Sequence, residues 1–268
     1  MKNFGFVLTR LFLLTNQKQI LLFFDRISLL LKVLRHLCGL LPDNLPVEKK
    51  KIVRFYDSCM SAEFLAEAHE DFTTPGGPCR VLLLTTSEST GIDFLDVDIV
   101  VNVDIPLTAA DAGQRRGRAL RKLSKHGLFL ILYEPWVRSL LLEEFEENQA
   151  TFNDDPDRPR AKLDEKSNVR DCAAYSMAWL LNDDTLCIRK FFKDYLEDES
   201  PSALDYHGPF CCDRHNNGFN LNNFLPSPVY KPSFNRPEGQ STEASSEDDN
   251  EAEGTSTQRK KYRTPISV

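Results

Sequence analysis

The sequence, 268 residues long, has no apolar run that could cross a lipid bilayer. A membrane-spanning helix needs about 20 consecutive apolar residues, and the Leu- and Phe-rich N-terminus is interrupted by Arg10, Lys18 and Asp25. It is not followed by the small-residue cleavage site of a secretory signal peptide. We therefore expect a soluble protein with no membrane partner, which starts abruptly inside a core element.

Cysteine is also scarce: the seven cysteines are an odd number and are scattered along the chain. A secreted disulfide framework is denser and even-numbered, so reduced thiols in the cytosol or nucleus are expected. The formal net charge of −7 argues against a uniformly basic coat for nucleic acid. Acidic residues crowd the C-terminal half, whereas residues 114–125 are strongly basic, so any nucleic-acid contact must be local.

What is present is a series of short apolar runs, each typical of a buried strand. Segments with helical spacing lie between them, at residues 27–37 and 61–72. Apolar strands that alternate with helices predict an α/β fold with a parallel sheet and helices on both faces. The predicted strands lie at residues 19–24, 51–56, 80–86, 97–103 and 127–133.

Two polar segments follow predicted strands. Residues 85–93 form a Thr- and Ser-rich loop, in which Gly91 permits close approach to the backbone and Asp93 could accept from a ribose hydroxyl. Residues 114–121 contain four arginines, whose guanidinium groups bind phosphate in a bidentate way. Such a cluster alone is typical of a solvated helix face. Because ligands bind beyond the carboxyl ends of parallel strands, we expect both segments on one rim of the sheet.

The order of these segments resembles the second RecA-like domain of superfamily 2 helicases, and most closely the RecQ family. Motif V of that family reads as a Thr-to-Gly-Ile-Asp loop, here residues 85–93, and motif VI as Gln-x-x-Gly-Arg-x-Gly-Arg, here residues 114–121. Leu120 stands where the family has the second glycine of motif VI. The resemblance covers residues 18–135 and implies a RecA-like lobe that takes part in ATP-driven, 3′-to-5′ translocation on DNA.

The resemblance also implies a role for each matching residue. Arg121 would be the arginine finger that reaches the γ-phosphate of ATP. Arg118 would sense the nucleotide and share one helix face with Arg121, three residues away. The implied nucleotide-site residues are Gln114, Gly117, Asp93 and Gly91, and the implied DNA contacts are Thr85, Thr86 and Ser58.

The sequence contains neither Gly-x-x-x-x-Gly-Lys-Ser/Thr nor Asp-Glu-x-His. An ATP-driven helicase needs a first lobe with these motifs to hold the phosphates of ATP and the Mg²⁺ ion. We therefore expect the C-terminal portion of a helicase, inactive unless a first lobe is supplied in cis or in trans. The alternatives are a non-catalytic lobe that binds a partner or DNA (single-stranded or forked), the relic of a helicase gene, and an unrelated α/β nucleotide-binding protein.

RecQ helicases carry a small, mainly helical domain after motif VI, which binds zinc through four cysteines. Residues 187–190 resemble the opening of that domain and residues 211–215 its closing knuckle. Pro209 falls on one cysteine of the family, so Cys211 or His207 would take that place. A vestigial helical pair with free thiols is the alternative. The implied zinc ligands are Cys187, Cys211, Cys212 and His215, and both residue types bind zinc well.

The remaining segments complete the predicted organisation. Trp179 lies in an apolar helical run and is expected in the core. The Pro-, Ser- and Glu-rich C-terminus cannot offset the entropy of ordering and is predicted to be disordered. Its basic cluster at 259–263 would suit nuclear import, with a solvated tail as the alternative, and the nucleus is the expected location. The predicted units are a RecA-like lobe at 1–142, a charged linker at 143–168, the zinc-binding-like domain at 169–216 and a disordered tail at 217–268.

Overall fold

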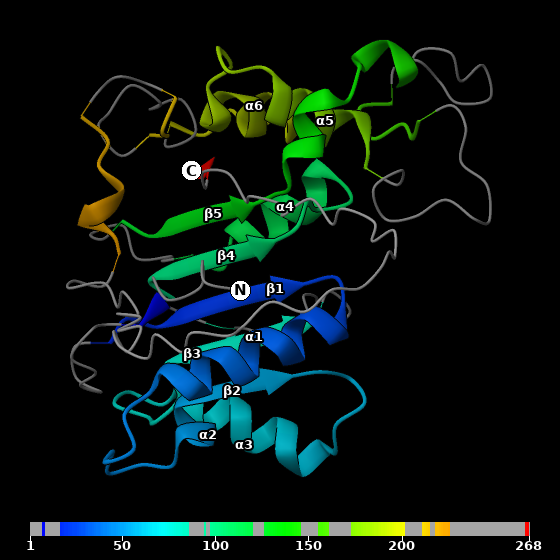
Figure 1. Ribbon diagram of the computed structural model, residues 1–268. Coiled ribbons are helices and arrows are strands. Elements are labelled where there is room, and N and C mark those ends of the chain that lie inside the picture. The colour runs from blue at the N-terminus through cyan, green and yellow to red at the C-terminus, as the bar shows by residue number, and fades with distance from the viewer. Residues whose placement is uncertain are drawn as a thin grey trace, which may run out of the picture.

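The computed structural model describes the sheet of the protein and the helices around it (Figure 1). None of the described helices is long and apolar enough to span a membrane. The described residues are 7–8, 17–85, 94, 97–119, 126–145, 155–160, 173–201, 211–214, 218–225 and 266–267.

A mostly parallel sheet forms the centre of the molecule. Its strands are β1 (Ile20–Phe24), β2 (Val53–Tyr56), β3 (Val81–Thr85), β4 (Ile99–Val103), β5 (Leu128–Leu132) and β6 (Ile266–Ser267). Within the described residues their order is β2-β3-β1-β4-β5-β6, and only the β5–β6 pair is antiparallel. Phe24 lies opposite both Thr85 and Val103, and Val103 lies opposite Leu132. The carboxyl ends of β1, β3, β4 and β5 therefore meet at one edge.

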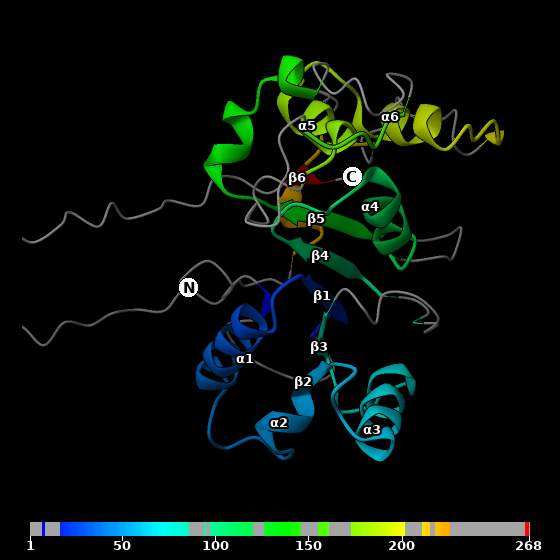
Figure 2. The ribbon, with the colours of Figure 1, turned by 90° about the vertical axis from the view of Figure 1, so that its right-hand side faces the viewer.

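Four helices cover the two faces of the sheet. They are α1 (Ile27–Leu40), α2 (Lys49–Ile52), α3 (Ala62–Thr73) and α4 (Ala109–Arg116). Leu21 and Phe23 of β1 share a core with α3 and α4, whereas Leu22 and Phe24 share a second core with α1 and α2, as the two-residue period of a strand requires. Figure 2 shows α1 and α2 on one side of the sheet and α3 and α4 on the other. The predicted α/β fold with helices on both faces is confirmed.

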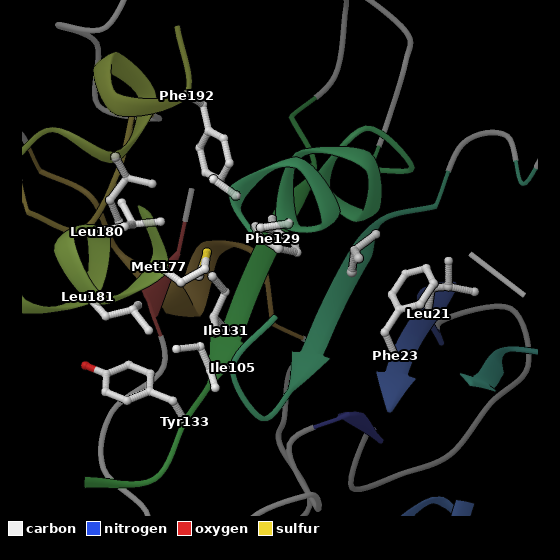
Figure 3. Close-up of a cluster of buried hydrophobic side chains, with 14 of the residues drawn as sticks. Leu21, Phe23, Ile105, Phe129, Ile131, Tyr133, Met177, Leu180, Leu181 and Phe192 are labelled. Atoms are coloured by element: carbon white, nitrogen blue, oxygen red, sulfur yellow. The ribbon is translucent and has the colours of Figure 1, made fainter. Parts of the chain in front are cut away.

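Two further helices and two short 3₁₀ helices pack beyond β5. They are α5 (Tyr175–Asn182), α6 (Ile188–Tyr195), η3 (Pro135–Ser139) and η4 (Leu142–Phe145). Figure 3 shows Met177 and Leu180 of α5 and Phe192 of α6 gathered with Phe129 and Ile131 of β5. These side chains belong to the same core as Leu21 and Phe23. One core thus runs from the sheet into α5 and α6, while the predicted domain boundaries stay a prediction.

Two short segments of the tail that the sequence predicts to be disordered are among the described residues. Phe224, which follows η5 (Leu221–Asn223), is buried in the core on the α1 side of the sheet, and its carbonyl oxygen accepts a hydrogen bond from Lys18. β6 pairs with β5 through its backbone. These contacts attach residues 218–225 and 266–267 to the sheet and its core, and the predicted disorder of the tail stays a prediction. Residues 226–265 lie outside the described residues.

Candidate functional site

Acidic and hydroxyl side chains gather where the parallel strands end. Asp25 directly follows β1, Asp57 follows β2 and Asp104 follows β4, while Thr85 is the last residue of β3. Parallel α/β sheets commonly bind ligands at this edge. The predicted placement of Thr85 on the carboxyl rim is therefore confirmed.

Arg115 of α4 ties three elements together at this edge. Its side chain is only 1% exposed, forms an ion pair with Asp25 at 3.2 Å and donates a hydrogen bond to the Oδ1 atom of Asn102 in β4. The guanidinium carbon also lies 5.5 Å from the centre of the Phe23 ring. Because a buried charge is tolerated only when it is paired and hydrogen-bonded, Arg115 fixes α4 against β1 and β4.

The sequence prediction singled out Arg118 and Arg121 and missed this role of Arg115. A signal for it was present, since Arg115 lies three residues after Ala112 and six after Ala109, and all three are buried. Two small residues at helical spacing mark the face of α4 that packs on the sheet. An arginine on that face has to find partners inside the protein.

Asp104 lies beside this network in an unusual backbone conformation. Its φ angle is +74°, in the left-handed region that Asp and Asn tolerate better than most residues. Its carboxylate accepts from Arg26 at 2.8 Å, and its carbonyl oxygen accepts from the Asn102 side chain at 2.6 Å. Burial raises the pKa of Asp104 above its ordinary value, although Arg26 counteracts this effect. The side-chain carboxylate and the backbone carbonyl group of Asp104 thus both hold the chain in place after β4.

Thr85 and Asp57 form a second pair at the same edge. The Thr85 hydroxyl donates to Asp57 Oδ2 at 2.9 Å, and the Cys59 N–H donates to Asp57 Oδ1 at 3.1 Å. Burial favours a higher pKa for Asp57, but these hydrogen bonds outweigh it and hold the pKa below its ordinary value. Ser58 is exposed in the turn that follows. The DNA contacts predicted for Thr85 and Ser58 stay predictions.

The arginine segment does not continue as a helix. α4 ends at Arg116, Gly117 caps it and is exposed, and Arg118 lies beyond the helix with its N–H bonded to the Arg115 carbonyl at 3.1 Å. The expectation that Arg118 and Arg121 share a helix face is therefore wrong for Arg118. Residue Ala119 forms a parallel β-bridge with Val97, which leads into β4, and this pairing draws the chain out of the helix.

The backbone of the described part of the segment, residues 114–119, also runs away from the expected rim. Val97 precedes the first residue of β4, so the chain at Ala119 has reached the amino end of that strand. Among the described residues, the Arg115 side chain reaches back to the carboxyl edge. Gln114 is exposed on the last turn of α4, and Arg118 is half-buried. The sites predicted at Arg121, Asp93, Gly91, Thr86 and His215 lie outside the described residues.

Arg116 links the arginine segment to α6. Its guanidinium carbon lies 4.6 Å from the centre of the Phe192 ring. Burial lowers the pKa of Arg116, and the nearby positive charge of Arg189 lowers it further, against the effect of Asp198. Two arginines from different helices are therefore close enough to repel each other.

Three of the predicted zinc ligands lie together. Cys187, Cys211 and Cys212 are buried, and their sulfur atoms lie within 4.8 Å of one another. The Cys187 and Cys211 sulfurs are 3.6 Å apart, close to the roughly 3.8 Å between two ligands of a tetrahedral zinc with bonds of about 2.3 Å. Burial and the neighbouring thiols raise the pKa of Cys211. The thiol spacing fits a zinc ion with three ligands from the described residues.

A comparison with protein-family models finds a similarity over part of the chain. Residues 6–122 match the family model described as "Helicase conserved C-terminal domain", a stretch that includes β1 to α4 and both Arg118 and Arg121. This part of the chain is similar to the C-terminal lobe of superfamily 1 and 2 helicases, and the sheet is that of a RecA-like lobe.

Solved structures that are similar to part of this chain have low sequence identity to it. The C-terminal part of the Fun30 ATPase domain is 15% identical, with 46% of this chain and 38% of that chain covered and a TM-score of 0.36. Mss116p DEAD-box helicase domain 2 bound to an RNA duplex is 18% identical, with 44% and 43% covered and a TM-score of 0.36. E. coli DEAD-box protein SrmB bound to regulator of ribonuclease activity A is 22% identical, with 43% and 61% covered and a TM-score of 0.34. The chain spans less than two thirds of each of these proteins.

Proposed function

We propose that this chain provides the second RecA-like lobe of an ATP-dependent 3′-to-5′ DNA helicase of the RecQ type. The observation that carries the proposal is the match of residues 6–122 to the helicase C-terminal domain, since this stretch ends in the arginine segment. Within that segment Arg115 is used by the fold, so Arg118 and Arg121 are the residues assigned to the nucleotide.

ATP is bound between this lobe and a first lobe, on the same chain or on another. The first lobe supplies the phosphate-binding loop and the Mg²⁺ site, neither of which the sequence contains. Arg121 stabilises the charge on the transferred phosphoryl group. Arg118 and Gln114, with Gly117, Gly91 and Asp93, complete the nucleotide side, and Thr85, Thr86 and Ser58 contact the DNA backbone.

The test begins with the native transcript upstream of the Met1 codon. An in-frame Gly-x-x-x-x-Gly-Lys-Ser/Thr and Asp-Glu-x-His would supply the first lobe in cis; otherwise a first lobe is added in trans. In the two-lobe protein, Arg121→Gln should lower the DNA-stimulated kcat for ATP by about 10³-fold or more. Arg35→Gln, an exposed change on α1, should leave it unchanged. An unchanged kcat in Arg121→Gln would contradict the proposal and favour a non-catalytic binding lobe.

The substrate is tested separately from hydrolysis. Forked DNA duplexes with a 3′ or a 5′ single-stranded tail, and RNA duplexes of the same sequence, are unwound in parallel. The proposal expects unwinding only of the DNA with the 3′ tail. Unwinding of RNA alone would leave the helicase lobe intact and reject its RecQ character.

We also propose that the cysteine cluster binds one zinc ion, with His215 as the fourth ligand. A bound Zn²⁺ would hold α6 to residues 211–215, and structural zinc sites contribute directly to folding. The full chain should contain about one zinc per molecule, and Cys187→Ser and His215→Ala should each lose it. Cys59→Ser, at an exposed cysteine, is the matched control. Metal-free protein of unchanged stability would reject the site.

The proposed location is the nucleus. The basic residues of 259–263 would act as the import signal. A fluorescent fusion of the full chain should concentrate in nuclei and lose this pattern when Lys260 and Lys261 are changed to Gln. Cytoplasmic fluorescence of the unchanged fusion would reject this part of the proposal.

A further inference from the structure

Helix α6 packs against the second half of α4, the helix that leads into the arginine segment. Figure 3 shows the Phe192 side chain pointing from α6 toward α4. A Cβ atom added to Gly113 of α4 would lie 3.8 Å from the Phe192 ring and 3.9 Å from Leu196. The guanidinium carbon of Arg116, the last residue of α4, lies 4.6 Å from the centre of the same ring. The end of α4 therefore rests on α6.

The first residue of α4 is held by Asp157, which α6 also contacts. The Asp157 carboxylate accepts hydrogen bonds from the Ala109 N–H at 3.4 Å, from the Ser176 hydroxyl at 2.5 Å and from the Tyr195 hydroxyl of α6. Burial and the charge of Asp157 raise the pKa of Tyr195, so its hydroxyl stays protonated and keeps donating. The first N–H groups of a helix have no partner within the helix, and a carboxylate there also interacts favourably with the helix dipole.

The support around Asp157 is itself fixed by backbone hydrogen bonds. Asp157 lies in the predicted charged linker, where the Pro156 carbonyl oxygen accepts from the Ser176 N–H at 2.9 Å. The Ala174 N–H donates to the carbonyl oxygen of Leu107, just before α4, at 3.1 Å. The start of α4, the start of α5 and the last residue of α6 are therefore joined at one carboxylate.

The other end of α4 leads directly to a residue that we assign to the nucleotide. The Gly117 N–H donates to the Gly113 carbonyl oxygen at 2.9 Å, and the Arg118 N–H donates to the Arg115 carbonyl oxygen at 3.1 Å. The position of α4 thus sets where the backbone of Arg118 lies. A misplacement of about 1 Å at a catalytic group costs a rate of about 100-fold.

We propose that Tyr195 and Phe192 of α6 are positioning residues for the nucleotide site. Through Asp157 and Arg116 they hold the two ends of α4, and α4 places Arg118 for ATP hydrolysis. Both residues act through α4 rather than on ATP itself. The proposal rests on the proposed function, since the placement of Arg118 affects hydrolysis only when ATP is bound between two lobes.

The first test measures hydrolysis in the two-lobe protein. Tyr195→Phe removes the hydroxyl that donates to Asp157 and keeps the ring. It should lower the DNA-stimulated kcat for ATP about 5- to 50-fold and change KM by less than about 2-fold, because the lost placement is needed in the transition state. The matched control is Tyr133→Phe, which loses a hydrogen bond from Arg138 and should keep the parent kcat.

A purely structural role would lower the unfolding midpoint in both tyrosine variants and leave kcat unchanged at a temperature where the protein is folded. A kcat within about 2-fold of the parent value in Tyr195→Phe, where Arg121→Gln lowers it, overturns the proposal.

The second variant removes the ring that Arg116 contacts. Phe192→Leu keeps an apolar side chain but loses the cation–π contact, and kcat should fall about 2- to 30-fold. Phe72→Leu changes a similarly buried ring of the same core on α3, and should leave kcat unchanged. An equal loss of kcat in both phenylalanine variants would mean a general packing effect and would contradict the role of Phe192.

Hydrogen exchange of the full chain tests the hold on α4 without a first lobe. The Gly117 and Arg118 amides should exchange about 2- to 10-fold faster in Tyr195→Phe and Phe192→Leu, and at the parent rate in both control variants. Unchanged exchange in the two α6 variants overturns the proposal. Faster exchange, with a kcat that even Arg121→Gln does not lower, rejects the proposed function and leaves the hold of α6 on α4 intact.

Discussion

At the scale of single residues, the carboxyl edge of the sheet depends on one buried arginine. Arg115 is 1% exposed, forms an ion pair with Asp25 and donates a hydrogen bond to Asn102. Arg115→Met would leave Asp25 without this partner inside the protein, and breaking a buried ion pair in this way costs about 3–5 kcal/mol of unfolding free energy. Urea denaturation measures the loss, and Arg35→Met on the surface of α1 should change the midpoint little. A similar midpoint for both variants would contradict the assigned role of Arg115.

The Thr85–Asp57 pair gives a pH-dependent prediction at the same scale. The hydrogen bonds from Thr85 and Cys59 keep the pKa of Asp57 below its ordinary value, so the charged form stabilises the folded state above the unfolded pKa of about 3.9. This contribution is lost as the pH falls through the lowered pKa. Thr85→Val should therefore cost about 1–3 kcal/mol at pH 7 and less below pH 4. Thr85→Ser, which keeps the hydroxyl, is the control in unfolding experiments from pH 3 to 7; a cost for Thr85→Val independent of pH would reject the pair.

At the scale of elements, the end of α3 requires a glycine where the chain turns back toward β3. A Cβ atom on Gly77 would lie 2.3 Å from the Asp71 carbonyl oxygen, which already accepts from the Cys79 N–H. Gly77→Ala should therefore lower the unfolding free energy by about 1–3 kcal/mol. Gly39→Ala is the matched change, because Gly39 lies within α1 and a Cβ there meets no heavy atom within 4 Å. It should raise stability by about 0.5–1 kcal/mol, and thermal unfolding should place the two variants on opposite sides of the parent protein.

Some of the helices and strands could be predicted from the sequence, and others could not. The five parallel strands were predictable because each is a short, continuous apolar run between turns, and a buried parallel strand needs little else. The end of α4 was not predictable from the local sequence, because it depends on a bridge between Ala119 and Val97, which are 22 positions apart. The same limit applies to Trp179, which was expected in the core but is 37% exposed, since an apolar helix does not reveal which side faces the core. The cysteine cluster was found only through its spacing in a family motif.

At the scale of the whole molecule, the shared core predicts cooperative unfolding. Leu180 of α5 is fully buried among side chains of β5 and α6, so Leu180→Ala should cost about 2–5 kcal/mol. Because the core is continuous, the sheet and α5 should unfold together. Far-UV circular dichroism, which follows all helices and strands, and the fluorescence of Trp179 in the Trp136→Phe protein should give the same midpoint. Two separate transitions would mean that α5 and α6 are an independent domain.

The charge of the whole molecule sets how binding to nucleic acid responds to salt. The net charge of −7 opposes association with phosphates, so attraction must come from local cations such as those of the arginine segment. Each phosphate contact with single-stranded nucleic acid contributes about −0.7 to the slope of log K against log salt. Three or four contacts thus predict a slope of about −2 to −3. Titrations from 50 to 300 mM KCl test this slope, and binding insensitive to salt would contradict phosphate contacts altogether.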